Sequence, residues 1–212
     1  MTFRVLSIDG GGMRGVYSAA YLASLERTFC VQRGVPGLDI GKAFHLVVGT
    51  STGAIIGCGL AKGTSPDDIL TLYKDNGAHI FPRKMPSALG WDLLVQLWQR
   101  PSLLRAGTKA LRNALEGVFQ QTTMRQLWDE RGIALAIPAV DMATYRAWVF
   151  KTPHDAQTNH RDDHFSIVDV CLATSAAPLF RSLAGIPQLQ GGGHEVFADG
   201  GLWANNPILV AL

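Results

Sequence analysis

The chain has 212 residues, of which 47% are hydrophobic and 17% are charged, and its formal net charge is +2. This length can bury a sizeable core, and this composition excludes an intrinsically disordered protein. The small net charge gives no support for nucleic-acid binding, although it would not repel an anionic membrane. Cys30, Cys58 and Cys171 are widely spaced, which favours free thiols in a reducing compartment over a disulfide framework.

No secretory signal peptide is visible, because strand-like residues begin at Phe3. No uninterrupted apolar run reaches about 18 residues, so no segment is expected to span a bilayer. We therefore expect a cytoplasmic protein that contacts membranes peripherally, if at all. We expect one domain over residues 1–212, truncated at its C-terminus because the sequence stops inside the beginning of a helical pattern.

The first motif is a glycine-rich turn, Asp9-Gly-Gly-Gly-Met-Arg-Gly15, between a predicted strand at residues 3–8 and a predicted helix at 16–28. Residues 10–15 fit the dinucleotide pattern G-x-G-x-x-G, which keeps a nucleotide-binding module open as an alternative. That pattern also needs an acidic residue at the end of a second strand, about 20 residues on. Glu26 falls inside the helix and Asp39 in a loop, so this support is missing.

The same turn fits an oxyanion hole. Consecutive glycines at Gly10, Gly11 and Gly12 let several backbone N–H groups face one point at the start of a helix. Arg14 adds positive charge beside them. A tight turn alone accounts for one or two glycines, but not for three followed by Met-Arg-Gly15.

Residues 45–61 read as a buried strand, a sharp turn and a helix of small residues. Gly49-Thr-Ser-Thr-Gly53 matches G-x-S-x-G, the nucleophile elbow. In that turn Ser51 takes a strained backbone conformation, and Gly49 and Gly53 leave room for the chain to fold tightly. The next helix directs its N-terminus at any anion that forms there. An incidental serine in a glycine turn is the alternative, but the flanking strand and helix favour the nucleophile.

The segment at residues 80–105 departs from the regular pattern, since it mixes aromatic residues and leucines with prolines and a basic fringe that includes Arg83 and Lys84. We favour an irregular connection that packs its aromatics on the core. The alternative is a lid or a lipid-contacting element, amphipathic with basic flanks.

The rest of the chain alternates helices and strands. Helices are predicted from Ser65 to about Gly77 and at residues 109–119, 122–130 and 167–175, and strands at 133–140, 145–151 and 195–198. A polar loop at 152–164 carries His154, His160, Asp162, Asp163 and His164. Their spacing fits no tight metal-ligand template, so we expect a solvated loop without a metal.

A serine nucleophile needs a base within hydrogen-bond reach. The order Ser, Asp, His of an α/β-hydrolase cannot be completed here, because no histidine follows Asp199 and His194 lies before it. Asp199 stands at a predicted strand end and is followed by Gly200 and Gly201, which permit close approach. A Ser51–Asp199 dyad remains.

These three motifs, in this order, resemble the patatin-like phospholipase family. The resemblance covers nearly the whole chain and includes Ala173-Thr-Ser-Ala-Ala-Pro178 and Asp199-Gly-Gly-Leu-Trp-Ala-Asn-Asn-Pro207. It implies a lipid acyl hydrolase of the phospholipase A type that acts on phospholipids or glycerolipids without a metal or other cofactor. Ser51 would be the nucleophile and Asp199 the base, and the amides of Gly10, Gly11 and Gly12, with Arg14 nearby, would hold the oxyanion.

The expected fold is α/β, a three-layer α/β/α arrangement with a largely parallel central sheet. A general carboxylesterase or lipase acting on other esters is the alternative within the same class. Family analogy adds a third possibility, a regulated effector whose C-terminal part senses a small ligand or a partner.

Overall fold

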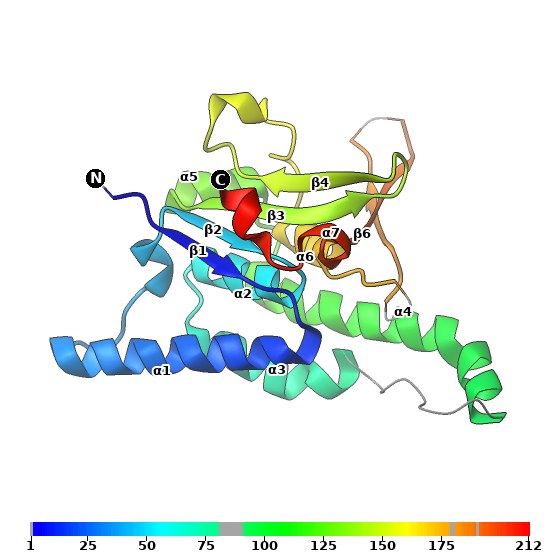
Figure 1. Ribbon diagram of the computed structural model, residues 1–212, viewed down its shortest axis with the longest axis horizontal. Coiled ribbons are helices and arrows are strands. Elements are labelled where there is room, and N and C mark those ends of the chain that lie inside the picture. Colours follow the sequence, from blue (N-terminus) through cyan, green and yellow to red (C-terminus); the bar gives the residue numbers. More distant parts are fainter. Residues whose placement is uncertain (1, 81–90, 179–180, 190) are drawn as a thin grey trace.

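A six-stranded mixed sheet runs through the centre of the protein (Figure 1). The computed structural model describes residues 2–80, 91–178, 181–189 and 191–212. The strands are β1 (Val5–Ile8), β2 (Leu46–Gly49), β3 (Ala134–Asp141), β4 (Arg146–Lys151), β5 (Ala184–Pro187) and β6 (His194–Asp199). β1, β2 and β3 pair in parallel, β4 and β6 pair antiparallel to β3, and β5 pairs antiparallel to β6. β1, β2, β3 and β5 therefore point the same way, which confirms the largely parallel sheet.

Helices connect these strands and cover the sheet. The α-helices are α1 (Gly15–Arg33), α2 (Thr52–Lys62), α3 (Pro66–Ile80), α4 (Trp91–Phe119), α5 (Met124–Arg131), α6 (Ile167–Thr174) and α7 (Gly201–Ala204). The 3₁₀ helices are η1 (Gly12–Arg14), η2 (Ile40–Ala43), η3 (Ala156–Thr158) and η4 (Pro207–Ala211). Side-chain caps fix several starts: the Ser65 and Ser166 hydroxyls accept from amides three residues on, and Thr123 forms a capping box with Gln126.

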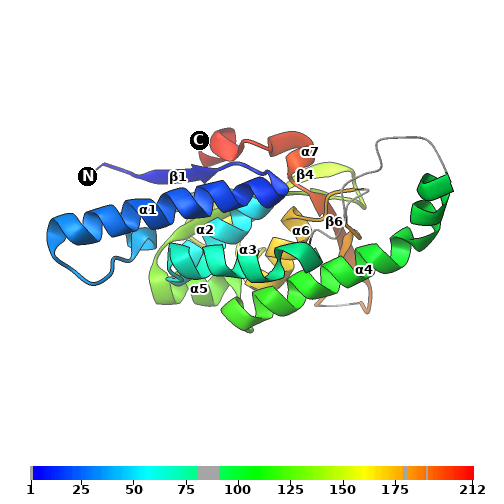
Figure 2. The ribbon, with the colours of Figure 1, turned by 90° about the horizontal axis from the view of Figure 1, so that it is seen from below.

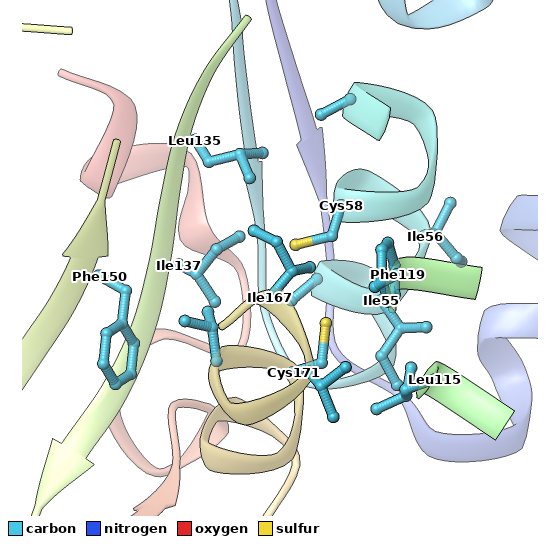
Figure 3. Packing of buried hydrophobic residues seen from close by; sticks show 14 of the residues in the cluster. Ile55, Ile56, Cys58, Leu115, Phe119, Leu135, Ile137, Phe150, Ile167 and Cys171 are labelled. Atoms are coloured by element: carbon cyan, nitrogen blue, oxygen red, sulfur yellow. The ribbon is translucent and has the colours of Figure 1, made fainter. Parts of the chain in front are cut away.

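The layers on the two faces differ in thickness. α2 and α6 lie directly on one face, with α1, α3 and α4 outside them (Figures 1 and 2). Figure 3 shows part of the core between the sheet and these helices, where Ile137 of β3 lies near Ile167 of α6, and Ile55 of α2 lies near Leu115 and Phe119 of α4. On the other face a smaller apolar cluster packs under the C-terminal residues of η4. The structure is thus of the expected three-layer type, with a thin second helical layer.

Two strands end head to head against one edge of β3. β2 pairs with residues 134–136 and β6 pairs with residues 139–141, on the same edge because β4 occupies the other. β2 runs parallel to β3 and β6 runs antiparallel, so their carboxyl ends at Gly49 and Asp199 point toward each other. Pro138, which has no N–H to donate, lies where the neighbour changes. This topology brings together the residues that follow the two strands.

The prediction for residues 80–105 was partly wrong. Residues 81–90, with Arg83 and Lys84, lie outside the described residues, so the lipid-contact alternative is not addressed there. From Trp91 onward the chain is the first part of the long helix α4, and not an irregular connection. Pro101 lies inside this helix, and Figure 1 shows α4 bent near its beginning. A proline inside a helix removes one hydrogen bond and produces a kink without always ending the helix.

Smaller differences concern element ends. α3 continues through Gly77 to Ile80, and a Cβ at Gly77 would meet the Met13 side chain at 3.2 Å. Gly77 therefore serves close packing, and not helix termination. β5 and α7 were not predicted, because four residues each is too short for a periodic pattern. Cys58 and Cys171 are buried free thiols, as expected, and Cys30 is half-buried.

The histidine-rich loop is held by ion pairs. Asp162 is buried, accepts from the Lys151 amide at 2.9 Å, and pairs with Arg161. Asp163 pairs with His160 at 2.9 Å and with Arg125 at 3.4 Å. These contacts order a loop that is largely exposed to solvent, as expected, and that has Asp162 buried within it. Within the described ranges, no three His, Cys, Asp or Glu side chains are grouped so as to hold a metal ion.

Candidate active site

Ser51 occupies a strained turn between β2 and α2. Its backbone angles are φ 54° and ψ −122°, in the region that disfavours residues with a side chain. A Cβ built at Gly49 would lie 2.6 Å from the Gly53 carbonyl oxygen, and a Cβ at Gly53 would overlap the carbonyl of Ile8. Only glycine fits at these two positions, as the G-x-S-x-G pattern requires. Ser51 occupies the N-cap position of α2 without a capping hydrogen bond from its side chain, which lies at the positive end of a buried helix.

Asp199 meets Ser51 at the end of β6. The Asp199 carboxylate accepts from the Gly201 amide at 2.6 Å, and the Ser51 side chain is close enough to act on its pKa. Asp199 is only 6% exposed. Burial raises the pKa of this carboxyl above its usual value, while the Gly201 amide, the Ser51 hydroxyl and the charge of Arg181 oppose the rise. The site therefore holds a hydroxyl and a partly desolvated carboxyl group next to each other.

Thr174 connects the turn at Ser51 to strand β3. Its hydroxyl accepts from the Ser51 amide at 3.0 Å and donates to the Pro138 carbonyl at 2.6 Å. The Thr174 carbonyl accepts from the Gly200 amide at 3.2 Å. The end of α6 thus contacts both Ser51, two residues after β2, and Gly200, the first residue after β6, and it spans the gap between the two strand ends.

The third motif folds back over the first two. The Thr50 hydroxyl donates to the Ala204 carbonyl at 2.5 Å, and the Gly10 amide donates to the Asn205 carbonyl at 2.9 Å. A Cβ at Gly10 would lie 2.6 Å from the Asn205 side-chain oxygen. The glycine turn, the serine turn and the residues after Asp199 therefore form one site, although they are far apart in the sequence.

These contacts limit which backbone amides of the glycine turn can bind an oxyanion. The Gly10 amide is already used by Asn205, so it is not available to bind an oxyanion. The amides of Gly11 and Gly12 meet no acceptor among the described residues. Arg14 is exposed, and its Nε donates to the Gly11 carbonyl at 3.4 Å. The Arg14 side chain therefore contacts the glycine turn itself and stabilises its conformation.

Among the described residues, no second feature supports the dinucleotide-binding alternative. β2, the strand after the first helix, ends at Gly49 and is followed by Thr50 and Ser51, and not by an acidic residue. Glu26, the nearest acid by spacing, accepts from the Leu38 amide at 3.3 Å from within α1. The turn that would hold a pyrophosphate is joined to Asn205 through Gly10.

Three positions near the site were not singled out from the sequence. Thr174 and Asn205 belong to the motifs quoted above, and their short polar side chains next to small residues were a usable signal. Arg181 is buried and follows the same motif as Thr174, but an arginine after a leucine-phenylalanine pair has no distinctive pattern. The burial of Arg181 results from the packing of α4, α6 and β6, which are distant from one another in the sequence.

Comparison with known proteins agrees with this geometry. The profile of the family described as patatin-like phospholipase matches residues 6–212. The chain belongs to this family. Its patatin-like relatives include cGAMP-activated phospholipases of Vibrio cholerae, 33% identical over 99% of this chain and 56% of the relative, and of Pseudomonas aeruginosa, 36% identical over 100% and 56%. Patatin-like protein 1 of Oryza sativa subsp. indica is 30% identical over 98% of this chain and 50% of that protein.

The chain spans about half the length of these relatives. Among solved structures, the chain of VipD from Legionella pneumophila is 17% identical, with a TM-score of 0.49 over 94% of this chain and 46% of that chain. In the part of this patatin-like chain that the structure describes, no helix is long and apolar enough to cross a membrane.

Proposed function

We propose that the protein is a lipid acyl hydrolase of the phospholipase A type, with Ser51 as nucleophile and Asp199 as base. The meeting of the strained turn at Ser51, on the N-terminus of α2, with the buried Asp199 carboxyl carries this proposal. Membership in the patatin-like phospholipase family supports it. The hydroxyl would donate to a carboxylate whose partly desolvated setting makes it a stronger base than a carboxylate in water.

The proposed reaction has two steps. Ser51 Oγ attacks the acyl carbonyl carbon while its proton passes to Asp199, and the tetrahedral oxyanion is held by the free amides of Gly11 and Gly12. Collapse breaks the ester bond, and Asp199 returns the proton to the leaving alcohol oxygen. Water then attacks the acyl-enzyme and loses its proton to Asp199, which passes that proton to Ser51 Oγ as the ester bond breaks and the fatty acid leaves. Neither step requires a metal.

A phospholipid or glycerolipid acyl ester at a membrane surface is the proposed substrate class. Support comes from the names of the relatives, which describe phospholipases. A general carboxylesterase acting on soluble esters is the alternative, since the dyad chemistry is the same for both.

The test compares phospholipid vesicles with monomeric short-chain esters, for the full-length protein and its Ser51→Ala variant. We expect fatty-acid release from vesicles that falls by at least about a thousandfold in Ser51→Ala, because the nucleophile is lost. Turnover of soluble esters without any release from vesicles would favour the carboxylesterase. Undiminished hydrolysis by a folded Ser51→Ala protein would contradict both.

Activation by a cyclic dinucleotide is proposed for the whole protein on one observation: three relatives matching 99–100% of this chain are named cGAMP-activated phospholipases. We expect cGAMP to increase fatty-acid release by the full-length protein and to leave Ser51→Ala inactive. Equal rates with and without cGAMP would contradict this part and leave the hydrolase proposal standing.

A further inference from the structure

Helix α3 contacts the candidate site, although none of the three sequence motifs lies within it. Its C-terminal end lies beside the first turn of α1, where the glycine turn leads into that helix (Figures 1 and 2). Tyr73 and Gly77 are four residues apart in α3, so they lie on the same face of the helix. Both are buried, and each contacts a residue next to one of the two turns of the site.

Tyr73 contacts the turn that carries the candidate nucleophile. Its hydroxyl donates to the carbonyl of Thr52, the residue after Ser51, at 3.0 Å. Tyr73 is only 1% exposed, and burial raises the pKa of its hydroxyl, so the proton that makes this hydrogen bond is retained. Thr52 is buried as well, and a Cβ at Gly15 would lie 3.1 Å from the Thr52 Cβ. Thr52 is therefore enclosed between α1 and α3.

Gly77 contacts the residue that follows the glycine turn. A Cβ at Gly77 would lie 3.2 Å from Met13 Cε and 3.3 Å from Met13 Sδ, which is closer than ordinary van der Waals contact. Met13 directly follows Gly12, and both belong to the 3₁₀ helix η1. The Gly12 amide is one of the two that we propose to hold the oxyanion. The lack of a side chain at Gly77 thus leaves space for Met13 beside this amide.

We propose that Tyr73 and Gly77 are positioning residues, which together hold the turn at Ser51 and the glycine turn at a fixed distance from each other. The inference rests on the proposed function of Ser51 and of the Gly11 and Gly12 amides. Oxyanion-hole donors stabilise a transition state only at hydrogen-bond distance from the place where the oxyanion forms. The nucleophile sets that place, so the two turns need a common support, and one face of α3 contacts both.

The first test removes the Tyr73 hydroxyl in the full-length protein. Labelling of Ser51 by a fluorophosphonate probe is measured over a range of probe concentrations, which separates the limiting rate from the half-saturating concentration. We expect Tyr73→Phe to lower the limiting rate about tenfold, because the turn loses one hydrogen bond that holds it. The half-saturating concentration should stay within about twofold of the wild type, because the transition state is affected and not probe binding.

Thr152→Val is the matched control for Tyr73→Phe. The Thr152 hydroxyl is also fully buried and accepts from the Leu135 amide at 2.9 Å, but this contact lies near the beginning of β3, whereas the site lies beside Pro138. The control should lose stability and keep the wild-type limiting rate. A wild-type limiting rate in Tyr73→Phe, or equal slowing in folded Thr152→Val, would overturn the inference.

The second test is a rescue that a purely structural role of α3 would not produce. Gly77→Val adds a side chain where Met13 lies, and we expect the limiting rate to fall at least about tenfold as the glycine turn is displaced. Met13→Ala in the same protein removes the clashing atoms, so the double variant should recover to within about threefold of Met13→Ala alone. Gly117→Val is the control and should keep the wild-type rate, because no atom of the described residues lies within 4 Å of a Cβ there.

The outcomes separate this inference from the proposed function. A folded Gly77→Val protein with the wild-type limiting rate, or a double variant as slow as Gly77→Val, would contradict the positioning role. If Gly77→Val does not fold, Gly77→Ala replaces it with the same rescue, and we then expect a slowing of about threefold. Failure of the wild type to be labelled, or equal labelling of Ser51→Ala, would instead overturn the proposed function.

Discussion

At the scale of single residues, the ionised Asp199 that the proposed reaction needs lowers the stability of the folded protein. Asp199 is buried and its pKa is raised mainly by desolvation, so the folded protein disfavours the ionised form that the proposed reaction needs. A folded-state pKa above the unfolded value means that stability is lost as the pH rises through the folded pKa. Ionised Asp199 is therefore a cost to folding that is kept for its chemistry.

Asp199→Asn is predicted to separate the two effects. At pH 7 the variant should be more stable than the wild type by about 1 kcal/mol, since it removes a buried charge. The difference should shrink toward pH 4, because a carboxyl with a raised pKa takes up its proton earlier as the pH falls. Urea unfolding at both pH values measures this, with the exposed Asp75→Asn as control. A stability gain that grows as the pH falls would contradict the pKa direction.

We predict that Thr174 contributes both to the stability of the turn at Ser51 and to the rate at which Ser51 reacts. Thr174→Val leaves the Ser51 amide and the Pro138 carbonyl without their partner. We expect a loss of about 2 kcal/mol in the free energy of unfolding and slower labelling of Ser51. Ser175→Ala is the matched control, because the Cys171 carbonyl is the only partner of that buried hydroxyl among the described residues. It should lose stability without slowing the reaction; equal slowing in both variants would contradict the assignment to Thr174.

At the scale of elements, the site depends on β2 and β6 ending head to head along β3. Gly200, the first residue after β6, lies against the Pro138 carbonyl, and a Cβ there would overlap that oxygen. Gly200→Ala is predicted to destabilise the protein by about 3 kcal/mol and to displace Asp199. Gly117→Ala, on an open position of α4, should instead stabilise by roughly 0.5–1 kcal/mol. Thermal melts of the two variants test this prediction. An unchanged melting temperature in Gly200→Ala would show that the Pro138 carbonyl leaves room for a side chain at the end of β6.

The sequence predicted the elements whose signals are local. The strand, glycine turn and helix at the N-terminus, the elbow and the capped helix at Ser166 are all present. It missed what depends on contacts between distant segments. The engagement of Gly10 by Asn205, the bridging role of Thr174 and the burial of Arg181 follow from the pairing of β3 with both β2 and β6. The helical start of α4 was missed because Pro101 suggested a break that the helix accommodates as a kink.

At the scale of the whole molecule, three motifs separated by about 40 and 150 residues meet at one sheet edge. This arrangement explains why none of them is convincing alone, whereas together they identify the family. The chain spans about half the length of its relatives, so vesicle hydrolysis and any response to cGAMP belong to experiments on the full-length protein.

The most direct test of the central claim is the intact mass of the protein after reaction with a fluorophosphonate probe. The wild type should gain a single adduct that maps to Ser51, Ser51→Ala should gain none, and Asp199→Asn should react at least about a hundredfold more slowly because the base is lost. An adduct of equal yield on folded Ser51→Ala, or no adduct on the folded full-length wild type, would contradict the Ser51–Asp199 dyad.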